Sequence, residues 1–229
     1  MLSPYAKPKN PEFRTRTVPP ADAAFTLVEL LTVIATIGIL AGIIIPTVGR
    51  VRDTARSTQC MNNIRQLGMA LTLYAHDNKN RYPPVYNSNR DLDWRNIIFK
   101  NLYSRDYDST LFRTTVFACP AAMRNNETNI SYGMNAMVPR QSSTPPSQSS
   151  ETYADRIQTP SRTCMLIENS NEVAGVLDAA ELGKIYAAQA RHRKRYNVVY
   201  YDGHARTHPL PEIPADASTD QGKIFWKGL

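Results

Sequence analysis

Two successive patterns of apolar and polar residues divide the first third of the chain. The first is an apolar stretch, because the nineteen residues from Leu30 to Val48 carry no charged side chain. As a helix, this stretch would be about 28 Å long, close to the hydrocarbon thickness of a bilayer. Together with its flanking residues it predicts a membrane-spanning helix over 25–48.

The second pattern begins at residue 49 and is amphipathic. Apolar residues recur at three- and four-residue steps, while polar residues such as Asn62 and Asn63 occupy the other faces. The apolar positions are Met61, Ile64, Leu67, Gly68, Leu71 and Ala75. This spacing predicts that 49–82 holds an amphipathic helix of the globular domain, packed on a sheet.

Residues 83–229 are predicted to complete one globular α+β domain. Apolar residues at helical steps indicate a short helix near 92–103, with Trp94 in the core. Two short runs rich in apolar and β-branched residues, Thr114–Cys119 and Thr163–Glu168, indicate strands.

The second half of this domain predicts a loop and then a β-hairpin. Residues 139–160 are dense in Ser, Pro and Gln, and a segment of this composition cannot bury a core, so we expect a flexible loop. Further on, Tyr196–Tyr201 and His204–His208 are separated by Asp202-Gly203. An Asp-Gly pair favours the type I′ turn of a two-stranded hairpin.

Four residues distinguish the apolar stretch from a plain membrane anchor. Glu29 places a carboxylate within the span, which costs about 2.5–3.5 kcal/mol near a bilayer centre and therefore calls for a partner. Gly38 and Gly42 form a G-x-x-x-G spacing that lets another helix approach closely. Pro46 removes a helical hydrogen bond and is predicted to bend or loosen the helix.

The segment AFTLVE at residues 24–29, followed by the apolar stretch and Pro46, resembles the processing and assembly signal of type IV pilins and type II secretion pseudopilins. The resemblance implies that a prepilin peptidase cuts between Ala24 and Phe25, removes residues 1–24 as a leader peptide, and methylates the new amine of Phe25. It also implies that Glu29 pairs with the same amine of a neighbouring subunit. The family usually has Gly before the cut, so Ala24 predicts slower or altered processing at worst.

Later motifs resemble a group of pseudopilin-like proteins that carry this signal. They are the stretch Cys60–Pro84, FACP at 117–120, SYGMN at 131–135, and His192 followed after nine residues by Asp202-Gly203. The resemblance extends to about residue 208. It implies an α+β pilin-like fold, in which a long N-terminal helix, half transmembrane and half amphipathic, packs on a small antiparallel β-sheet with long loops.

The same resemblance implies a structural function without enzymatic activity. The chain would lie in the bacterial inner membrane as a single-pass protein, with a cytoplasmic N-terminus and a periplasmic or extracytoplasmic C-terminal domain. Its partners would be the prepilin peptidase, other filament subunits and the inner-membrane platform of a type II secretion system or pilus. Two alternatives stay open: a minor pilus subunit that binds DNA or a surface through a basic loop, and a plain membrane-anchored domain.

Charge gives limited support to nucleic-acid binding. The chain carries a net +7, and residues 191–195 read Arg-His-Arg-Lys-Arg, next to Tyr196. Basic residues beside an aromatic ring can bind phosphate. We favour a solvated loop, because the rest of the domain has no matching basic stripe.

Few residues indicate chemistry. The sequence contains no Gly-rich phosphate loop, G-x-S-x-G elbow or H-E-x-x-H motif, so we predict no enzyme and no cofactor. His192, Asp202, His204 and His208 could share a metal ion. We favour polar residues on the exposed side of the hairpin instead, and predict no metal.

The chain has three cysteines, Cys60, Cys119 and Cys164, which allow one disulfide and leave one thiol. Their spacing does not select the pair. In an oxidising compartment a Cys60–Cys119 bridge would join the amphipathic helix to the domain.

Overall fold

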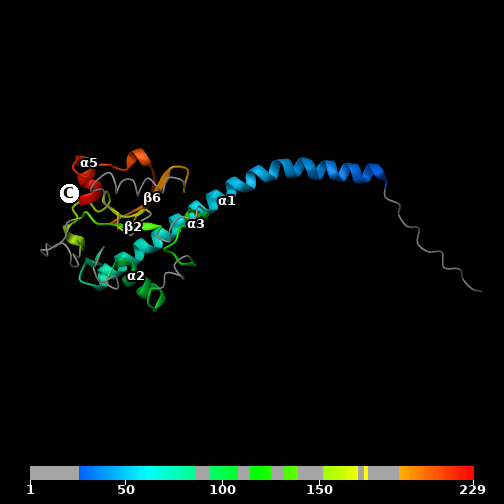
Figure 1. Cartoon of the computed structure of the whole chain (residues 1–229). Helices are drawn as coiled ribbons and strands as arrows, with labels where there is room; N and C mark the ends of the chain where they lie inside the picture. The colour runs from blue at the N-terminus through cyan, green and yellow to red at the C-terminus, as the bar shows by residue number, and fades with distance from the viewer. Residues whose placement is uncertain are drawn as a thin grey trace, which may run out of the picture. The chain divides into compact units, whose positions relative to one another are not determined.

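The chain forms one long helix and a small α+β domain (Figure 1). The computed structural model describes residues 26–85, 93–107, 114–124, 131–138, 152–169, 173–174 and 191–229. The chain divides into two compact units, residues 1–47 and residues 48–229. Helix α1 (Leu27–Asp77) contributes to both units. Ala24 and Phe25, the predicted cleavage site, lie outside the described residues.

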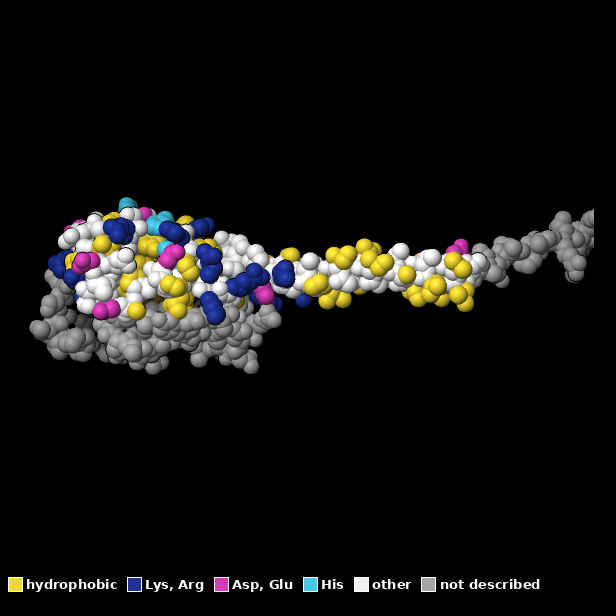
Figure 2. Space-filling view, turned by 90° about the horizontal axis from the view of Figure 1, so that it is seen from above, with side chains coloured by type: hydrophobic (Ala, Val, Ile, Leu, Met, Phe, Trp, Pro, Cys, Tyr) yellow, Lys and Arg dark blue, Asp and Glu magenta, His cyan; other side chains and the backbone are white. Residues whose placement is uncertain are grey.

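The first unit exposes the apolar part of α1. In the described part of the chain, α1 is the one helix long and apolar enough to cross a membrane. Figure 2 shows hydrophobic side chains along this part of the helix, and Leu27 and Ile45 are 79% and 72% exposed. The predicted long apolar N-terminal helix is therefore confirmed.

Helix α1 continues through Pro46. Proline has no N–H and cannot donate the helical hydrogen bond to the carbonyl four residues earlier. The next residue makes side-chain bonds in this turn: the Thr47 hydroxyl donates to the carbonyl oxygens of Ile43 at 3.2 Å and Ile44 at 2.7 Å.

The second part of α1 buries one face in the domain. Its buried residues are Cys60, Asn63, Ile64, Leu67, Gly68, Leu71 and Ala75. They follow the predicted three- and four-residue spacing, with one correction. Asn63, which we expected on an outer face, is buried because its side-chain N–H donates to the Ala118 carbonyl at 2.9 Å.

A five-stranded sheet carries the domain, in the order β5-β2-β4-β6-β7. Its strands are β2 (Tyr132–Asn135), β4 (Cys164–Glu168), β5 (Val173–Ala174), β6 (Arg195–Tyr200) and β7 (Ala205–Pro209). All neighbours are antiparallel except β2 and β5, which are parallel. This confirms the predicted α+β pilin-like architecture.

A separate two-stranded ladder pairs β1 (Arg81–Tyr82) with β3 (Thr152–Tyr153). A single 3₁₀ turn, η3 (Ala154–Arg156), follows β3. Both β3 and η3 lie in the segment 139–160, which we expected to be a flexible loop. Residues 139–151 of that segment lie outside the described residues.

The two faces of the sheet are covered by different parts of the chain. On one face, α1 comes so close that a Cβ on Gly68 would lie 2.6 Å from Cγ1 of Val199 in β6. On the other face, Val198 of β6 belongs to a second cluster with Phe225 and Trp226 near the C-terminus. Adjacent residues of β6 therefore point into different cores, as the alternation of a strand requires.

Helix α2 (Trp94–Tyr103) lies where the sequence predicted a short helix. The Asp93 carboxylate caps it by accepting from the backbone N–H groups of Arg95 at 3.0 Å and Asn96 at 3.1 Å. Trp94 is fully buried, as expected.

The strand predicted over Thr114–Cys119 is wrong, because these residues form turns that lead into α3 (Pro120–Arg124). Phe117 and Cys119 are both buried, so the apolar run reflects burial without strand pairing.

The β6–β7 hairpin is present, but its turn differs from the prediction. Val199 pairs with Ala205, and the Gly203 N–H donates to the Tyr200 carbonyl at 2.9 Å. Gly203 has φ +89°, whereas Asp202 does not have a positive φ, so the type I′ turn is wrong. The observed loop has three residues with Gly at the left-handed position.

The C-terminal segment covers the second face of the sheet with short helical turns. They are η5 (Leu210–Glu212), α5 (Asp220–Gly222) and the π-helical turn η6 (Lys223–Lys227). Trp226 is fully buried, and its indole N–H donates to the Pro214 carbonyl at 2.8 Å.

Candidate functional site

Most of the residues singled out by sequence lie in two parts of the chain: helix α1 and a buried cluster beside the sheet. At the start of α1, Thr26 and Glu29 bond reciprocally. The Thr26 backbone N–H and hydroxyl donate to Oε2 of Glu29 at 2.9 and 2.7 Å, and the Glu29 N–H donates to the Thr26 hydroxyl at 3.2 Å. This is a capping box, which satisfies backbone N–H groups that a helix start leaves unpaired.

Sequence reasoning missed this local role of Glu29, although the T-x-x-E spacing of the capping box was readable in the sequence. The cap fixes Glu29 at the first turn of α1, next to the predicted N-terminus at Phe25. A carboxylate has about four acceptor positions, so the bonds to Thr26 leave room for a further donor.

Gly38 and Gly42 lie on the exposed part of α1. A Cβ built at either position would meet no atom within 4 Å. Within the described chain, the G-x-x-x-G face is therefore uncovered and accessible to another helix.

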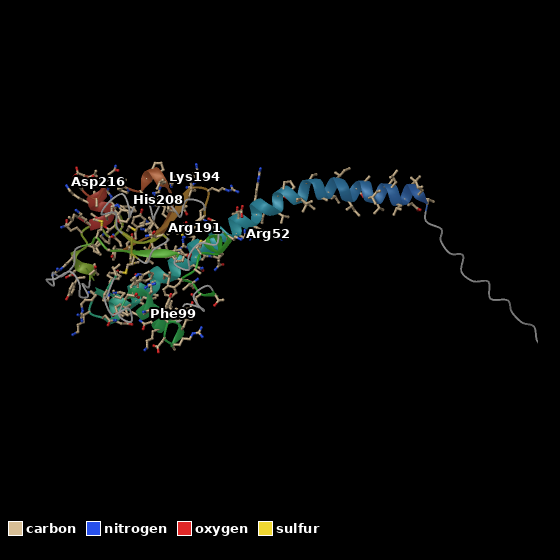
Figure 3. The ribbon with its side chains drawn as sticks, viewed as in Figure 1. Arg52, Phe99, Arg191, Lys194, His208 and Asp216 are labelled. Carbon is tan, nitrogen blue, oxygen red and sulfur yellow. A yellow bond between two sulfur atoms is a disulfide. The ribbon has the colours of Figure 1, made fainter. Side chains whose placement is uncertain are left out.

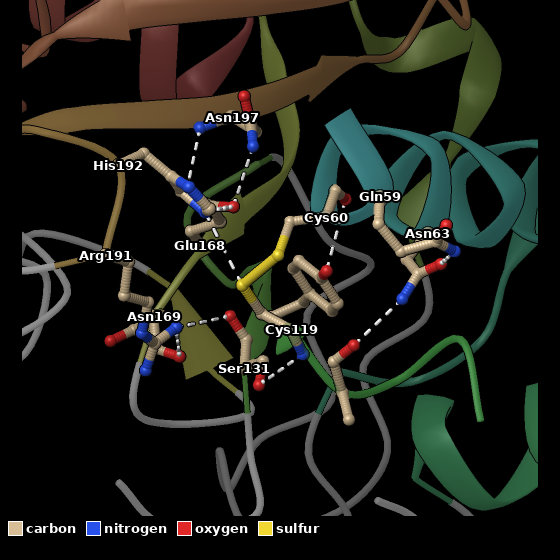
Figure 4. The surroundings of a disulfide bond; sticks show 12 residues. Gln59, Cys60, Asn63, Cys119, Ser131, Glu168, Asn169, Arg191, His192 and Asn197 are labelled. Carbon is tan, nitrogen blue, oxygen red and sulfur yellow. Dashed lines mark hydrogen bonds and ion pairs between the residues drawn. A yellow bond between two sulfur atoms is a disulfide. The ribbon is translucent and has the colours of Figure 1, made fainter. Parts of the chain in front are cut away.

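The second part is centred on a disulfide between Cys60 and Cys119 (Figure 4). Cys60 lies on the buried face of α1, and Cys119 directly precedes α3. Their Cα atoms are 5.0 Å apart, and 59 positions separate them in sequence. The bridge joins α1 to the loop that follows α2, and Cys164 remains as a buried thiol.

A glutamate and a histidine lie against this disulfide. Nε2 of His192 is 2.8 Å from Oε1 of Glu168 and 3.4 Å from Sγ of Cys119. Both side chains are almost fully buried, at 0% exposed for Glu168 and 2% for His192. Nδ1 of His192 is buried with no partner among the described residues. The proton therefore belongs on Nε2, where the carboxylate accepts it.

Asn197 holds the carboxylate of Glu168 from the adjacent strand. Its backbone N–H donates to Oε2 at 3.1 Å, and its side-chain N–H donates to Oε1 at 2.8 Å. A buried carboxylate is stable only when its oxygens are paired, and here β6 supplies those donors.

Further bonds fix the surroundings of the disulfide. The Cys119 N–H donates to the Ser131 hydroxyl at 2.8 Å, and the Tyr132 hydroxyl donates to the Cys60 carbonyl at 3.1 Å. The Arg191 guanidinium donates to the carbonyls of Ser131 at 3.1 Å and Asn169 at 3.4 Å. The two bonds of Arg191 hold the turn that carries His192 against the residue before β2 and the residue after β4.

The structure separates the four polar residues that we considered as one exposed group. His192 belongs to the buried cluster described above. His208 is also buried. Its Nε2 lies 2.8 Å from the Tyr200 hydroxyl, and its Nδ1 lies 2.8 Å from Oε2 of Glu212. Only Asp202 and His204 lie at the hairpin end, where they pair at 2.6 Å. The expectation of an exposed polar set is therefore wrong for His192 and His208.

The His192 and Asp202-Gly203 motif has two structural roles in this fold. His192 contacts Glu168 and the disulfide, whereas Gly203 supplies the left-handed residue of the β6–β7 turn. The segment between them contains β6, which brings Asn197 to Glu168. The nine residues between His192 and Asp202 therefore span the rest of the turn, strand β6 and Tyr201.

The basic loop is only partly exposed (Figure 3). Arg191 and His192 are buried, and their side chains bond inside the domain. Arg193, Lys194 and Arg195 are exposed, and the first two have positive φ values of 53° and 65°. Such values are uncommon for residues other than Gly, and here they accompany a tight turn. Three exposed cations make a small patch.

Sequence reasoning found His192 and the cysteines but missed Glu168 and Asn197. Glu168 is the last residue of a predicted strand, and Asn197 lies inside one, so both looked like ordinary strand positions. A polar residue within an otherwise apolar strand was the available signal.

Comparison with known proteins agrees with the predicted resemblance. Residues 49–99 match the family described as "Protein of unknown function (DUF1559)". The chain is also 36% identical over 57 residues to "Type II secretion system core protein G" of Pseudomonas aeruginosa. These 57 residues make up 25% of this chain and 40% of that protein. No solved structure matches the chain. The pilin-like fold and these two partial matches agree with the resemblance to type II secretion pseudopilins.

Proposed function

We propose that this protein is a structural subunit of an inner-membrane-rooted filament of the type II secretion kind. One observation carries the proposal: a pilin-like processing signal precedes an apolar helix whose side chains are not covered within the described chain. The partial match to a type II secretion core protein supports the same assignment.

The exposed apolar part of α1 needs two successive environments. Burying one Leu or Ile side chain contributes about 1.5–3 kcal/mol, so a row of such side chains is unstable in water. Before assembly the bilayer would cover them, and after assembly the same helices of neighbouring subunits would. Gly38 and Gly42 would let those helices approach closely.

Glu29 would select the neighbour. A carboxylate at the first turn, already positioned by Thr26, would accept the methylated Phe25 amine of another subunit after cleavage at Ala24. In a low-dielectric bundle of helices, this ion pair would stabilise the register in which both charges are neutralised.

The domain would lie on the extracytoplasmic side and the N-terminus in the cytoplasm. A disulfide between Cys60 and Cys119 supports this placement, since disulfides persist in oxidising compartments. The partners would be the prepilin peptidase, the secretion platform and other filament subunits. We propose no enzymatic activity.

The DNA-binding alternative receives less support. It needs a basic surface, but Arg191 and His192 bond inside the domain and leave three exposed cations in that loop. A plain membrane-anchored domain would explain the apolar helix but leaves the segment 24–29 without a role.

The first experiment is intact mass and N-terminal sequencing of protein recovered from membranes of cells that contain a prepilin peptidase. We expect a chain that begins at Phe25 and carries one methyl group. A chain that still begins at Met1 in these cells would favour the plain anchor over the filament route.

The second experiment separates the cap from the intermolecular pair. Glu29→Ala removes the carboxylate that serves both the cap and the intermolecular pair, whereas Thr26→Val removes the two hydroxyl bonds of the cap and retains the carboxylate. We expect both variants to be cleaved, and only Glu29→Ala to disappear from sheared filaments. Normal filaments from Glu29→Ala would contradict the proposed role of Glu29.

A further inference from the structure

We propose that Cys60, Cys119, Glu168 and His192 bind one zinc ion when the disulfide is reduced, so that the cluster has a disulfide form and a metal form. One ligand atom from each of the four residues lies within 4.8 Å of the others, and all four residues are buried. They come from four separate parts of the fold: α1, the residue before α3, the end of β4 and the turn before β6.

The chemistry of the donor set fits zinc. Two thiolates, one imidazole and one carboxylate are ligands that zinc accepts in tetrahedral geometry, with Zn–S bonds of about 2.3 Å. Thiolate and imidazole donors together disfavour magnesium and calcium, which prefer oxygen ligands. The Cα atoms of the two cysteines are 5.0 Å apart, so after reduction small side-chain rotations would bring both sulfurs to one ion.

The supporting bonds would orient the ligands before the metal arrives. Asn197 fixes the carboxylate of Glu168 through two donors, and the backbone of Cys119 is held by Ser131. Outer partners of this kind orient ligands and raise the affinity of metal sites. In this cluster they come from β6 and from the residue before β2 (Figure 4).

The charges of the metal form would nearly cancel. A zinc ion with two thiolates and the Glu168 carboxylate leaves one negative charge. The buried Arg191 guanidinium, bonded to the carbonyls of Ser131 and Asn169 beside the cluster, supplies one positive charge. A nearly neutral set is what a buried site tolerates.

Reduction of the disulfide, followed by exchange of two thiol protons for zinc, converts the disulfide form to the metal form. A dithiol reductant converts the disulfide to two cysteine thiols and becomes a disulfide itself. Zinc then displaces one proton from each thiol, which releases two protons to solvent. Within His192 the proton moves from Nε2 to Nδ1, so that Nε2 binds the metal. Nδ1 then lacks an acceptor among the described residues, but this penalty is small beside the affinity of thiolate sites for zinc.

The test uses the full-length chain in detergent, reduced in denaturant and refolded without oxygen, with Co²⁺ as a spectroscopic probe for zinc. We expect one Co²⁺ per reduced chain, with the d–d bands of a tetrahedral site and a thiolate charge-transfer band, and its displacement by Zn²⁺. The oxidised chain should show none of these bands.

Variants assign the ligands. His192→Ala and Glu168→Gln should weaken metal binding by at least about tenfold, the scale seen when a metal site loses supporting interactions. Cys164→Ser changes the one cysteine outside the cluster and should retain the bands. Circular dichroism of each variant identifies any that fails to fold.

Two results would overturn the proposal. One is a reduced, folded wild-type chain that gives no thiolate–cobalt bands. The other is binding that survives in folded His192→Ala but is lost in folded Cys164→Ser, which would place the metal elsewhere. Both comparisons are independent of whether the chain assembles into filaments.

Discussion

Gly68 determines how closely α1 approaches the sheet. A Cβ at this position would lie 2.6 Å from Cγ1 of Val199, well inside normal contact distance. Gly68→Ala should therefore lower the free energy of unfolding by about 1–2 kcal/mol, because overpacking of a core outweighs the better helix propensity of Ala. Thermal unfolding followed by circular dichroism measures this change.

A matched control is Gly49→Ala, since a Cβ at Gly49 meets no atom within 4 Å. Its unfolding midpoint should be unchanged or slightly raised. The double variant Gly68→Ala/Val199→Ala should recover part of the loss by relieving the clash. If Gly68→Ala is as stable as the wild type, the spacing between α1 and β6 is not set by this contact.

Cys164 should be chemically inert in the folded protein. It is fully buried, and burial raises the pKa of its thiol, so the reactive thiolate is scarce at neutral pH. A thiol reagent should detect no thiol in the native oxidised chain and one after denaturation. Reaction of a second thiol without reductant would show that the Cys60–Cys119 bridge is incomplete.

Tyr132 makes stability depend on alkaline pH. Burial, followed by the Glu168 carboxylate, raises the pKa of its hydroxyl well above the usual value, and Arg191 acts in the opposite direction. Above about pH 10, the unfolded chain loses a proton that the folded chain keeps, so the free energy of unfolding should fall as pH rises. Below that pH the hydroxyl is protonated in both states and contributes no slope.

Tyr132→Phe keeps the ring and removes this ionisation. The variant should therefore lose less stability than the wild type between neutral and strongly alkaline pH, as measured by denaturant midpoints at each pH. Burial also raises the pKa of Tyr82 and Tyr200, so part of the slope should remain. Parallel pH profiles for Tyr132→Phe and the wild type would rule out this role.

At the scale of elements, periodicity predicted what local spacing determines. The buried face of α1, helix α2, strand β4 and the β6–β7 hairpin follow from apolar spacing and turn residues. The turn itself was mispredicted because Asp-Gly suits either a two-residue or a three-residue loop. The choice depends on the register, in which Val199 pairs with Ala205.

Long-range contacts explain the other errors. Phe117 and Cys119 looked like strand residues because they are apolar, but they are buried by tertiary contacts and a disulfide. Asn63 looked exposed because its partner, Ala118, lies 55 residues away. The buried pair of Glu168 and His192 could not be predicted from local spacing either, because the two residues lie 24 positions apart and in different elements.

The Cys60–Cys119 bridge ties α1 to the loop before α3. It closes a loop with a sequence separation of 59, for which the chain-entropy relation gives about 4 kcal/mol of stabilisation. Cys60→Ser/Cys119→Ser should reduce the free energy of unfolding by up to that amount in denaturant titrations. The wild type should lose stability in reductant, whereas the double variant should not respond, and an equal response of both would contradict the assignment.

At the scale of the whole molecule, one helix serves two kinds of surroundings. The part of α1 before Val48 carries exposed apolar side chains, and the later part closes the core of the domain. In the proposed function, the first part would meet lipid and then neighbouring subunits. Assembly would therefore depend on residues that make no contribution to the fold of the domain.

Gly38 and Gly42 test this division directly. Gly38→Ile/Gly42→Ile makes the span more apolar, so membrane insertion and cleavage at Ala24 should be retained. The added side chains would hold neighbouring helices apart, because close approach in a membrane depends on small residues. We expect normal amounts of mature protein in the membrane and a loss of most protein from sheared filaments, both measured by immunoblotting.

Thr36→Ile is the matched control. It adds a branched apolar side chain to the same span, but at about 160° from Gly38 around the helix, two residues away. The Thr36 hydroxyl donates to the Val33 carbonyl of its own helix, so its removal leaves no buried donor unpaired. Filaments should form normally from Thr36→Ile. Equal loss from both variants would mean that overall bulk, and not a small-residue face, limits assembly.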